Sequence, residues 1–346
     1  GITNVDIQWL FGVPPLSDLT PVHEAGSILR PFVPSNPDQR AMQQEWTRFV
    51  EEAKNADRVI DGFCERVLRV DVTADRATRE ALRSVKIVGV KELSGTATAP
   101  LLLALEGTNT SAVYKTPQRE PNLVKDAASA EDIAALKRLN RLDRLEKPVI
   151  EGVRQFEAFR REWLCSAIDR IFDFQLVPPL VLRNGPEGIG MVQKWEAGFS
   201  GAYGDWKTRV EEQKIIKLAL FHYLVWHCDG HDGNFNLRPD GELTAFDNGY
   251  SFSLEPSSVS GAFASEAAQF VAGKEVPEEL KKSLRYIVEI PTTQKLLKEV
   301  FAITFRRPDE AEFHLNGFLN RIDFMAPKDP NKVSRIPPSQ KTYTNT

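Results

Sequence analysis

The sequence is poor in the residues on which several protein classes depend. Only three of its 346 residues are cysteines, and none of them stands in a CxxC pair. This argues against a disulfide scaffold and against a structural zinc site, and it favours a reducing compartment. Positive charge is not in excess either, since 48 Asp and Glu outnumber 44 Lys and Arg. We therefore expect no nucleic-acid partner.

Long apolar runs are also missing. The most apolar stretch, residues 215–226, is interrupted by Lys217 and His222. It is too short and too polar to span a bilayer, so it predicts a buried helix and no transmembrane segment. The first residues lack the basic and apolar regions of a targeting signal. We expect a cytoplasmic protein, or one delivered into a host cytosol if it is an effector.

The composition, 42% hydrophobic and 27% charged, is typical of a globular protein, and the length allows two or three units. Changes in pattern divide the chain into a helical N-terminal extension at 1–84, a strand-rich segment at 85–198 and a mainly helical segment at 199–325. The tail, 326–346, is rich in Pro, Ser and Thr. We expect it to be extended or disordered unless it docks on the body.

The strongest chemical signal is a predicted hairpin that follows the buried helix. Its strands are 235–238 and 243–246, joined by a Pro-Asp-Gly turn. If the residues that flank the turn face each other, Asn234 lies within about one residue of Asp247 at the open end. Asp229 stands just upstream. Two acids and an amide are therefore expected to converge there.

That convergence fits phosphoryl transfer. Asp229 can accept the proton of an attacking hydroxyl, while Asn234 and Asp247 offer hard oxygen ligands for Mg²⁺ against nucleotide phosphates. The order D-x-x-x-x-N followed by D-x-G is the kinase-like arrangement of these roles. The alternative is a loop whose polar side chains only cap backbone groups. The oxygen donors favour Mg²⁺ or Mn²⁺ over zinc.

The preceding strands supply further parts in the expected order. A loop of small residues with Ser94, Gly95 and Thr96 would let backbone N–H groups approach phosphates. Lys115, at the end of a later strand, would place a positive charge on those phosphates, and Glu162 on the following helix would hold it. Alone, each is equally well a solvated surface residue.

Together these stretches resemble the phosphoinositide 3/4-kinase-like branch of the protein-kinase superfamily, and more narrowly its small bacterial members. The resemblance covers about residues 85–255. It rests on Val88-Gly89, Ser94-Gly95-Thr96-Ala97-Thr98, Ala112-Val113-Tyr114-Lys115, Arg161-Glu162, Leu176-Val177-Pro178-Pro179, Gly190 to Trp195, Asp229 to Asn234 and Asp247-Asn248-Gly249. It implies an α+β, bilobal protein-kinase-like fold with a strand-rich N-lobe, a hinge, a mainly helical C-lobe and the helical N-terminal extension.

The resemblance also implies roles for individual residues. Asp229 would be the catalytic acid/base, and His231 matches the His of the Asp-Arg-His motif of phosphoinositide 3-kinases. The hinge residues Gln193, Lys194 and Trp195 would contact adenine, mainly through their backbone. Other predicted contacts are Ser94, Gly95, Thr96 and Lys115 to ATP phosphates, Glu162 to Lys115, and Asn234 and Asp247 to the metal.

Three positions remain open to other interpretations. Gly230 stands where the phosphoinositide 3-kinase motif has Arg, which leaves the support of the loop in question. Asn248 stands where protein kinases have Phe, although type II phosphoinositide 4-kinases also carry Asp-Asn-Gly. His231 is equally a surface or hydrogen-bonding residue, and His227, at the end of the buried helix, is expected to be a core or C-cap residue.

We thus predict an ATP- and Mg²⁺-dependent kinase whose favoured acceptor is a serine or threonine hydroxyl of a protein. Alternatives are a phosphoinositide kinase, a weakly active nucleotide-binding regulatory module and a HipA-type kinase. A lipid acceptor is less favoured because the chain is net acidic and acids interrupt its densest basic run, 137–147. The chain itself is another candidate substrate, through the tail hydroxyls Ser334, Ser339, Thr342, Thr344 and Thr346.

Overall fold

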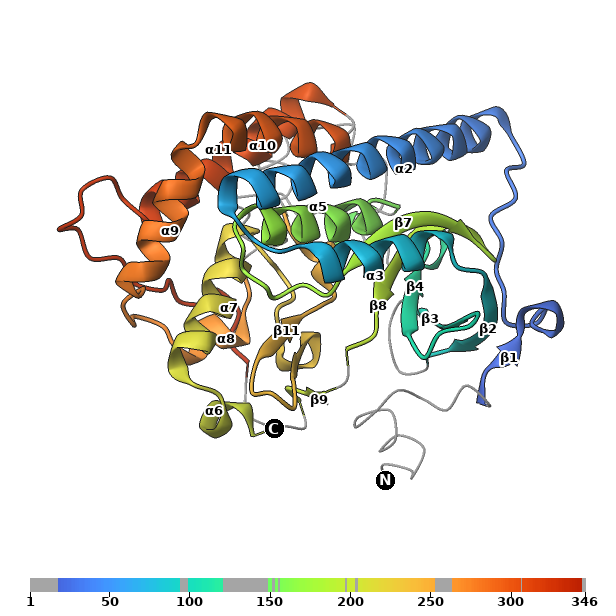
Figure 1. Cartoon of the computed structure of the whole chain (residues 1–346), viewed down its shortest axis with the longest axis horizontal. Coiled ribbons are helices and arrows are strands. Elements are labelled where there is room, and N and C mark those ends of the chain that lie inside the picture. The colour runs from blue at the N-terminus through green and yellow to red at the C-terminus, as the bar shows by residue number, and fades with distance from the viewer. Residues whose placement is uncertain are drawn as a thin grey trace. The chain divides into compact units, whose positions relative to one another are not determined.

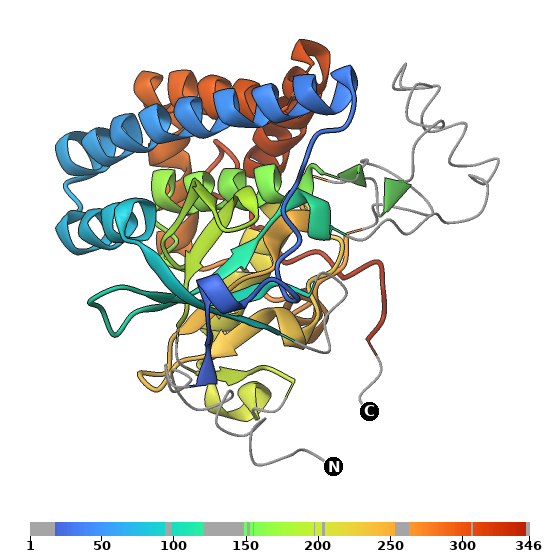
Figure 2. The same ribbon diagram turned by 90° about the vertical axis from the view of Figure 1, so that its right-hand side faces the viewer.

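The computed structural model describes residues 18–93, 99–120, 149–150, 153–154, 156–196, 198–202, 205–252, 263–305 and 307–343. The chain, drawn in Figures 1 and 2, divides into two compact units. The first comprises Gly1–Pro121 and Pro178–Gly198, and the second comprises Asn122–Val177 and Phe199–Thr346. The first carries the large sheet and the second carries most of the helices, as an α+β chain with a strand-rich and a mainly helical part predicts.

The first unit is built on a six-stranded antiparallel sheet. Its strand order is β1-β2-β3-β4-β8-β7, so β7 forms one edge. The strands are β1 (Thr20–Pro21), β2 (Ile87–Glu92), β3 (Leu101–Leu105), β4 (Ser111–Lys115), β7 (Leu180–Gly185) and β8 (Gly188–Lys194). Five of these strands, β2, β3, β4, β7 and β8, fall within 85–198, the segment that the sequence predicts to be strand-rich.

Two helices, α2 (Pro37–Phe63) and α3 (Thr73–Ser84), lie against β7 and β8 (Figure 2). Asn36 caps α2, as its position before Pro37 predicts: its side chain accepts a hydrogen bond from the Gln39 N–H at 2.9 Å. The π-helix Cys64–Leu68 follows α2. The Arg83 guanidinium of α3 pairs with Asp57 of α2 at 3.0 Å, which ties the two helices together.

The described part of the predicted N-terminal extension, 18–84, belongs to the same compact unit as the sheet. β1 adds to the sheet beside β2, and Leu82 of α3 is buried among strand residues such as Val90 and Tyr114. These are contacts between segments far apart in the sequence, so the pattern within 1–84 could not reveal them.

The second unit is mainly helical. Its helices are α5 (Ala158–Ile171), α6 (Trp206–Arg209), α7 (Glu212–Leu224), α8 (Glu266–Phe270), α9 (Glu278–Glu289), α10 (Pro291–Thr304) and α11 (Pro308–Met325). Its strands are β5 (Val149–Ile150) with β6 (Val153–Arg154), and the sheet of β9 (Phe199–Ser200), β10 (Phe235–Leu237) and β11 (Leu243–Ala245). α7 is buried, as predicted. α5 groups with this unit, not with the strands of 85–198, because it packs on α10.

The described part of the tail docks on the second unit. The Ile336 N–H donates to the Lys274 carbonyl and the Ile336 carbonyl accepts from the Gly273 N–H, both at 2.9 Å. The Gln340 N–H donates to the Phe263 carbonyl at 2.8 Å. Docking was one of the two outcomes expected for this segment, and it is the one observed.

All three cysteines are buried free thiols, in agreement with the expectation of no disulfide scaffold. Within the described ranges, no helix combines the length and the apolar character that a membrane crossing requires.

Candidate functional site

The predicted hairpin is present, and its register is confirmed. β10 pairs antiparallel with β11, with Asn236 opposite Thr244. One residue beyond the strands, the Phe246 N–H donates to the Asn234 carbonyl at 3.2 Å. This pairing brings Asn234 next to Asp247 at the open end of the hairpin, so local sequence order is enough to assemble these two oxygen donors.

The loop before the hairpin is held by Asn234. Its Nδ2 donates to the Asp229 carbonyl at 2.6 Å, which leaves the amide oxygen as the free end of the side chain. The His231 carbonyl accepts from the Asn234 N–H at 2.9 Å. The His231 Nε2 lies 3.8 Å from an Asp229 carboxylate oxygen, and both side chains are half-buried. The loop therefore keeps Asp229, His231 and Asn234 together.

His227 connects the two halves of the site, a role that the sequence analysis missed. Its Nδ1 accepts a hydrogen bond from the Asp229 N–H at 3.0 Å. The proton of the neutral ring must then sit on Nε2, which donates to the Asp247 carbonyl at 3.1 Å. A signal was available: His227, Asp229 and Asn234 stand in the order H-x-D-x-x-x-x-N of the kinase catalytic loop, with Cys228 in place of Arg.

The Asp-Asn-Gly segment is fixed by helix α5. Asp247 has left-handed backbone angles (φ 56°, ψ 47°), which a non-glycine residue adopts only when its surroundings hold it there. The Glu162 carboxylate accepts from the Asn248 N–H at 3.1 Å. The neighbouring Arg161 donates to the Ser251 carbonyl at 2.9 Å. Glu162, which the sequence predicts as the partner of Lys115, is here an acceptor for the backbone of the predicted metal-ligand segment.

Position 230 has no room for the arginine of the phosphoinositide 3-kinase motif. A Cβ atom there would lie 2.8 Å from the Ala264 carbonyl oxygen and 2.9 Å from the His222 Nδ1. The backbone at Gly230 is also paired with its neighbours, since its N–H donates to Ala264 and its carbonyl accepts from Glu266. The loop is supported by backbone pairing where the motif uses a side chain.

We expect Gly230→Ala to lower the free energy of unfolding by about 2 kcal/mol, because the methyl group displaces the Ala264 backbone or the buried His222 ring. Urea unfolding measures the change. Gly26→Ala is the matched control, since nothing lies within 4 Å of a Cβ built there. Equal stability of the two variants would contradict this account of position 230.

His222 gives the second unit a pH-dependent stability. Burial, with a contribution from the nearby His227, holds the pKa of His222 well below its usual range. Below about pH 6.5 the unfolded chain therefore binds a proton that the folded chain does not, and the folded state loses stability as the pH falls. Between pH 7.5 and 5.5 we expect this histidine to remove about 1.4 kcal/mol, and His222→Gln to lack that loss. Urea unfolding of both proteins at both pH values checks this; parallel losses would refute it.

In the first unit, Lys115 lies on the sheet face opposite the main core. Tyr114, its neighbour in β4, is buried in that core, and side chains alternate along a strand. Val113 and Lys115 are two residues apart in β4 and therefore share a face. Gln193 is paired with Val113, so it lies on this face as well. Trp195 packs on the same face, in a cluster with Leu102 and Ala104. These residues could form one wall of an adenine and phosphate site.

Two of the predicted hinge residues, Gln193 and Lys194, lie on opposite faces of the sheet. The Gln193 side chain is buried and donates to the Pro178 carbonyl at 3.3 Å. Lys194 is paired with Ala112, which belongs to the main core face, and its ammonium lies 3.2 Å from the Glu196 carboxylate. Contact of Lys194 with a nucleotide would therefore use its backbone, as the sequence analysis expects for the hinge.

The predicted phosphate loop, with Ser94, Gly95 and Thr96, and the basic run 137–147 lie outside the described residues. The two ends of that loop are described. The Leu93 N–H donates to the Pro100 carbonyl at 2.9 Å, which closes the base of the loop.

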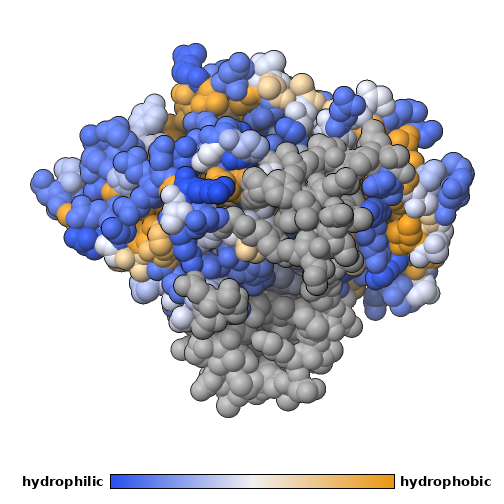
Figure 3. All heavy atoms as spheres, turned by 90° about the horizontal axis from the view of Figure 1, so that it is seen from below, coloured by the Kyte–Doolittle hydropathy of each residue, from blue (hydrophilic) through white to orange (hydrophobic). Residues whose placement is uncertain are grey.

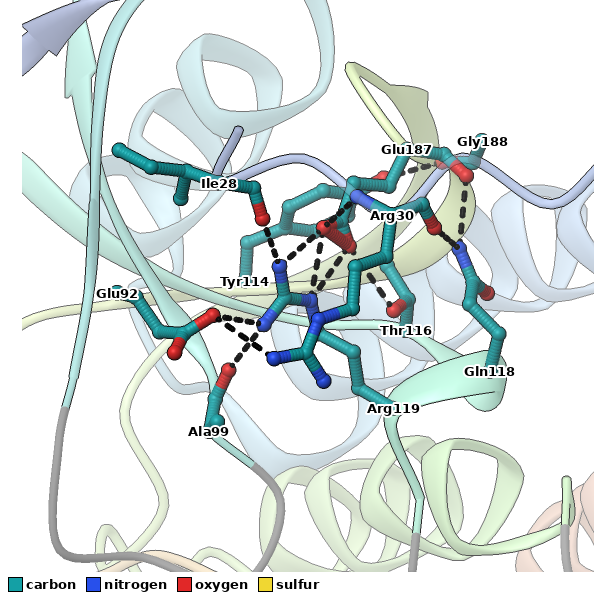
Figure 4. Close-up of polar contacts among 10 residues, drawn as sticks. All are labelled: Ile28, Arg30, Glu92, Ala99, Tyr114, Thr116, Gln118, Arg119, Glu187 and Gly188. Carbon is teal, nitrogen blue, oxygen red and sulfur yellow. Dashed lines mark hydrogen bonds and ion pairs between the residues drawn. The ribbon is translucent and has the colours of Figure 1, made fainter. Parts of the chain in front are cut away.

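A buried ion pair, shown in Figure 4, holds both ends of this loop. The Arg119 side chain is 1% exposed, and its Nε lies 2.7 Å from each carboxylate oxygen of Glu187, which is fully buried. Its Nη1 donates to the Glu92 carboxylate and to the Ala99 carbonyl, each at 2.8 Å. Glu92 precedes the loop and Ala99 follows it. The sequence analysis did not identify either partner of this ion pair.

The donor set limits what kind of metal site is possible. Across the described ranges, no group of three or more His, Cys, Asp or Glu side chains is placed to hold a metal ion. Asn234 and Asp247 would therefore need further oxygen ligands, and nucleotide phosphates and water are the usual ones for Mg²⁺. Such a metal would bind mainly together with the nucleotide.

No family model matches the chain, and no curated protein matches it. Among solved structures, the Golgi casein kinase with Mn and ADP bound is 14% identical, and the match covers 74% of this chain and 75% of that one at a TM-score of 0.47. Another Golgi casein kinase structure is 12% identical, with 90% and 96% covered and a TM-score of 0.44. Because both TM-scores lie below 0.5, the function proposed below rests on the chain's own residues.

Proposed function

We propose that the chain is a kinase-like phosphotransferase that moves the γ-phosphoryl group of ATP to a hydroxyl with the help of Mg²⁺ or Mn²⁺. The observation that carries the proposal is the His227 bridge between Asp229 and Asp247, together with the hairpin that places Asn234 beside Asp247. A capping loop needs no connection between these two acids. A phosphotransferase does, because the hydroxyl that its base deprotonates attacks the phosphate that its metal ligands hold.

The proposal gives each candidate residue a role. Asp229 accepts the proton of the attacking hydroxyl, with His231 beside it, and Asn234 and Asp247 ligate the metal. Lys115 contacts the phosphates, Glu162 is its acidic partner, and the face with Gln193 and Trp195 binds adenine. The bound metal would neutralise charge on the transferred phosphate. The assignment of the chain to the phosphoinositide 3/4-kinase-like branch rests on the motif resemblance alone.

A protein hydroxyl is the acceptor that we favour. Membrane-bound lipid kinases need an apolar or basic surface. The described residues drawn in Figure 3 are mostly hydrophilic, with hydrophobic atoms in separate patches. The tail is a poor self-substrate at Ser334, which is buried, and at Ser339, whose hydroxyl accepts from the Ser265 N–H at 3.1 Å. In the described part of the tail, Thr342 is exposed.

The test is incubation of the purified chain with [γ-³²P]ATP and Mg²⁺ in the presence of a generic protein or of vesicles that contain phosphatidylinositol. We expect label on protein and none in the Asp247→Ala variant. Label on lipid alone would make the chain a lipid kinase. ATP binding without any label would make it a nucleotide-binding regulatory module.

Metal dependence can be measured separately from transfer. We expect ATP to raise the melting temperature much more with Mg²⁺ than with EDTA, because the metal joins the phosphates to Asn234 and Asp247. Equal shifts under both conditions would argue against a metal at these residues.

A further inference from the structure

The first unit contains a cavity to which the proposed kinase chemistry assigns no role. It has a volume of about 470 Å³ and lies between α2, the end of α3 and the β7–β8 hairpin. Its apolar lining includes Trp46, Phe32 and Leu182. The Phe32 and Trp46 ring centroids are 4.9 Å apart, so the buried Trp46 holds the half-buried Phe32 ring at the cavity wall. Val50 and Ile189, also half-buried, add to the apolar surface.

The shape of the cavity fits an extended chain. Its α2 wall runs from Gln43 to Lys54, which corresponds to about 16 Å along a helix. That length accommodates about five residues of extended peptide. Opposite α2, three consecutive residues of β7, Leu182, Arg183 and Asn184, reach the cavity. Because side chains alternate along a strand, three consecutive residues cannot all point into the cavity. The cavity is therefore also lined by the backbone of β7, which is the edge strand of the sheet.

The charge of the cavity selects the kind of peptide. Lys54, Arg83 and Arg183 line it together with a single acid among the described lining residues, Glu51. Arg83 is already neutralised by carboxylates of α2 and α3. Arg183 is not: its guanidinium donates to the Leu82, Val85 and Asn184 carbonyls, and in the described part of the chain it forms no ion pair.

Arg183 is therefore a partly buried cation held by neutral carbonyls. Its hydrogen-bond partners carry no net negative charge, and burial lowers its pKa. Lys54 likewise forms no ion pair with the described residues. A carboxylate in the cavity would complement both cations, and a bulky apolar side chain beside it would cover Phe32, Val50 and Ile189.

We propose that this cavity is a docking groove for a short, extended, acidic peptide with a bulky apolar residue, supplied by a partner protein. The peptide lies along the β7 edge, its carboxylates pair with Lys54 and Arg183, and its apolar side chain packs on Phe32. The groove is separate from the residues assigned to phosphoryl transfer. Peptide binding in the groove can therefore be tested independently of the proposed kinase activity.

The probes are three fluorescein-labelled hexapeptides that share one backbone length. One carries two aspartates flanking leucine and tryptophan, the second has lysines in place of the aspartates, and the third has serines in place of leucine and tryptophan. Fluorescence anisotropy with the full chain should show saturable binding of the first peptide, at least about tenfold tighter than either of the others, since each ion pair or apolar anchor is worth about that factor.

Two charge reversals, one in the groove and one outside it, locate the binding. Lys54→Glu, in the groove, should weaken the acidic peptide by about tenfold or more, because it replaces an attractive charge with a repulsive one. Lys295→Glu on α10 is exposed and outside the groove, and should leave the affinity unchanged. Unchanged melting temperatures show that both variants fold. The Asp247→Ala variant should bind the peptide as the unmodified chain does.

Several results would overturn the proposal. Equal binding of the acidic and basic peptides, or equal weakening by Lys54→Glu and Lys295→Glu, would mean non-specific attraction. No saturable binding at millimolar peptide would mean that the groove is not a peptide site. Sedimentation that shows a dimer dissociated by Lys54→Glu would assign the groove to a second copy of the chain.

Discussion

Replacing Asp247 with alanine should abolish Mg²⁺-dependent ATP binding, whereas Asp229→Asn should leave binding largely intact and lower kcat by about 10³-fold. A metal ligand contributes to the bound ground state, because the metal joins the protein to the phosphates. A general base acts mainly in the transition state, so its loss is seen in turnover. Isothermal titration with ATP and Mg²⁺, and the initial rate of phosphate transfer, measure the two effects.

The hairpin offers a matched control for both variants. Asp240 is an exposed acid in the turn of the same hairpin, at the end opposite Asp247. Asp240→Asn should change neither ATP binding nor kcat. If Asp229→Asn weakens ATP binding as severely as Asp247→Ala, the assignment of base and metal ligand is wrong.

Arg119→Met should lower the free energy of unfolding by about 4 kcal/mol, the largest stability effect expected in the chain. The substitution leaves the Glu187 carboxylate buried and without its cationic partner, and breaking a buried pair in this way typically costs about 3 to 5 kcal/mol. It also releases the Glu92 side chain and the Ala99 carbonyl at the ends of the predicted phosphate loop. Urea unfolding gives the change in stability, and the KM for ATP reports the loop.

A second variant separates charge burial from loss of packing. The double variant Arg119→Met, Glu187→Gln should recover part of the loss, because a neutral amide needs no cation and can still accept the Arg30 N–H. Arg335→Met removes an exposed ion pair with Glu275, whose side chains are 58% and 59% exposed, and should cost about 1 kcal/mol or less. A loss in Arg119→Met no larger than in Arg335→Met would refute the importance of the buried pair.

The hairpin shows which parts of the candidate site could be predicted. Its strands, its turn and the pairing of Asn234 with Phe246 follow from residues within about twenty positions of one another, and antiparallel register is set by the turn. The Asn36 cap and the buried helix α7 are local in the same sense. Residue type and spacing are therefore sufficient to predict Asp229, Asn234 and Asp247 as neighbours.

The site's supports could not be predicted in this way. The sequence indicates a core or cap residue at His227 because its two partners, the Asp229 N–H and the Asp247 carbonyl, are backbone groups that carry no sequence signal. From the sequence, Gly230 is a departure from the phosphoinositide 3-kinase motif. In the folded chain, the Ala264 backbone and the His222 ring lie where the side chain of any other residue would be. Glu162 is predicted as a partner for Lys115 alone, yet it also holds the Asn248 N–H.

The sequence by itself determined the α+β composition, the order of the elements, the hairpin register and the candidate oxygen donors, because each depends on local periodicity or on a tight turn. The packing of 18–84 on the sheet, the docking of the described tail and the pairing of Arg119 with Glu187 emerge only in the folded chain. The last two residues are 68 positions apart in the sequence. Long-range pairing of this kind depends on how buried surfaces and charges fit once the chain is folded, and no local pattern encodes it.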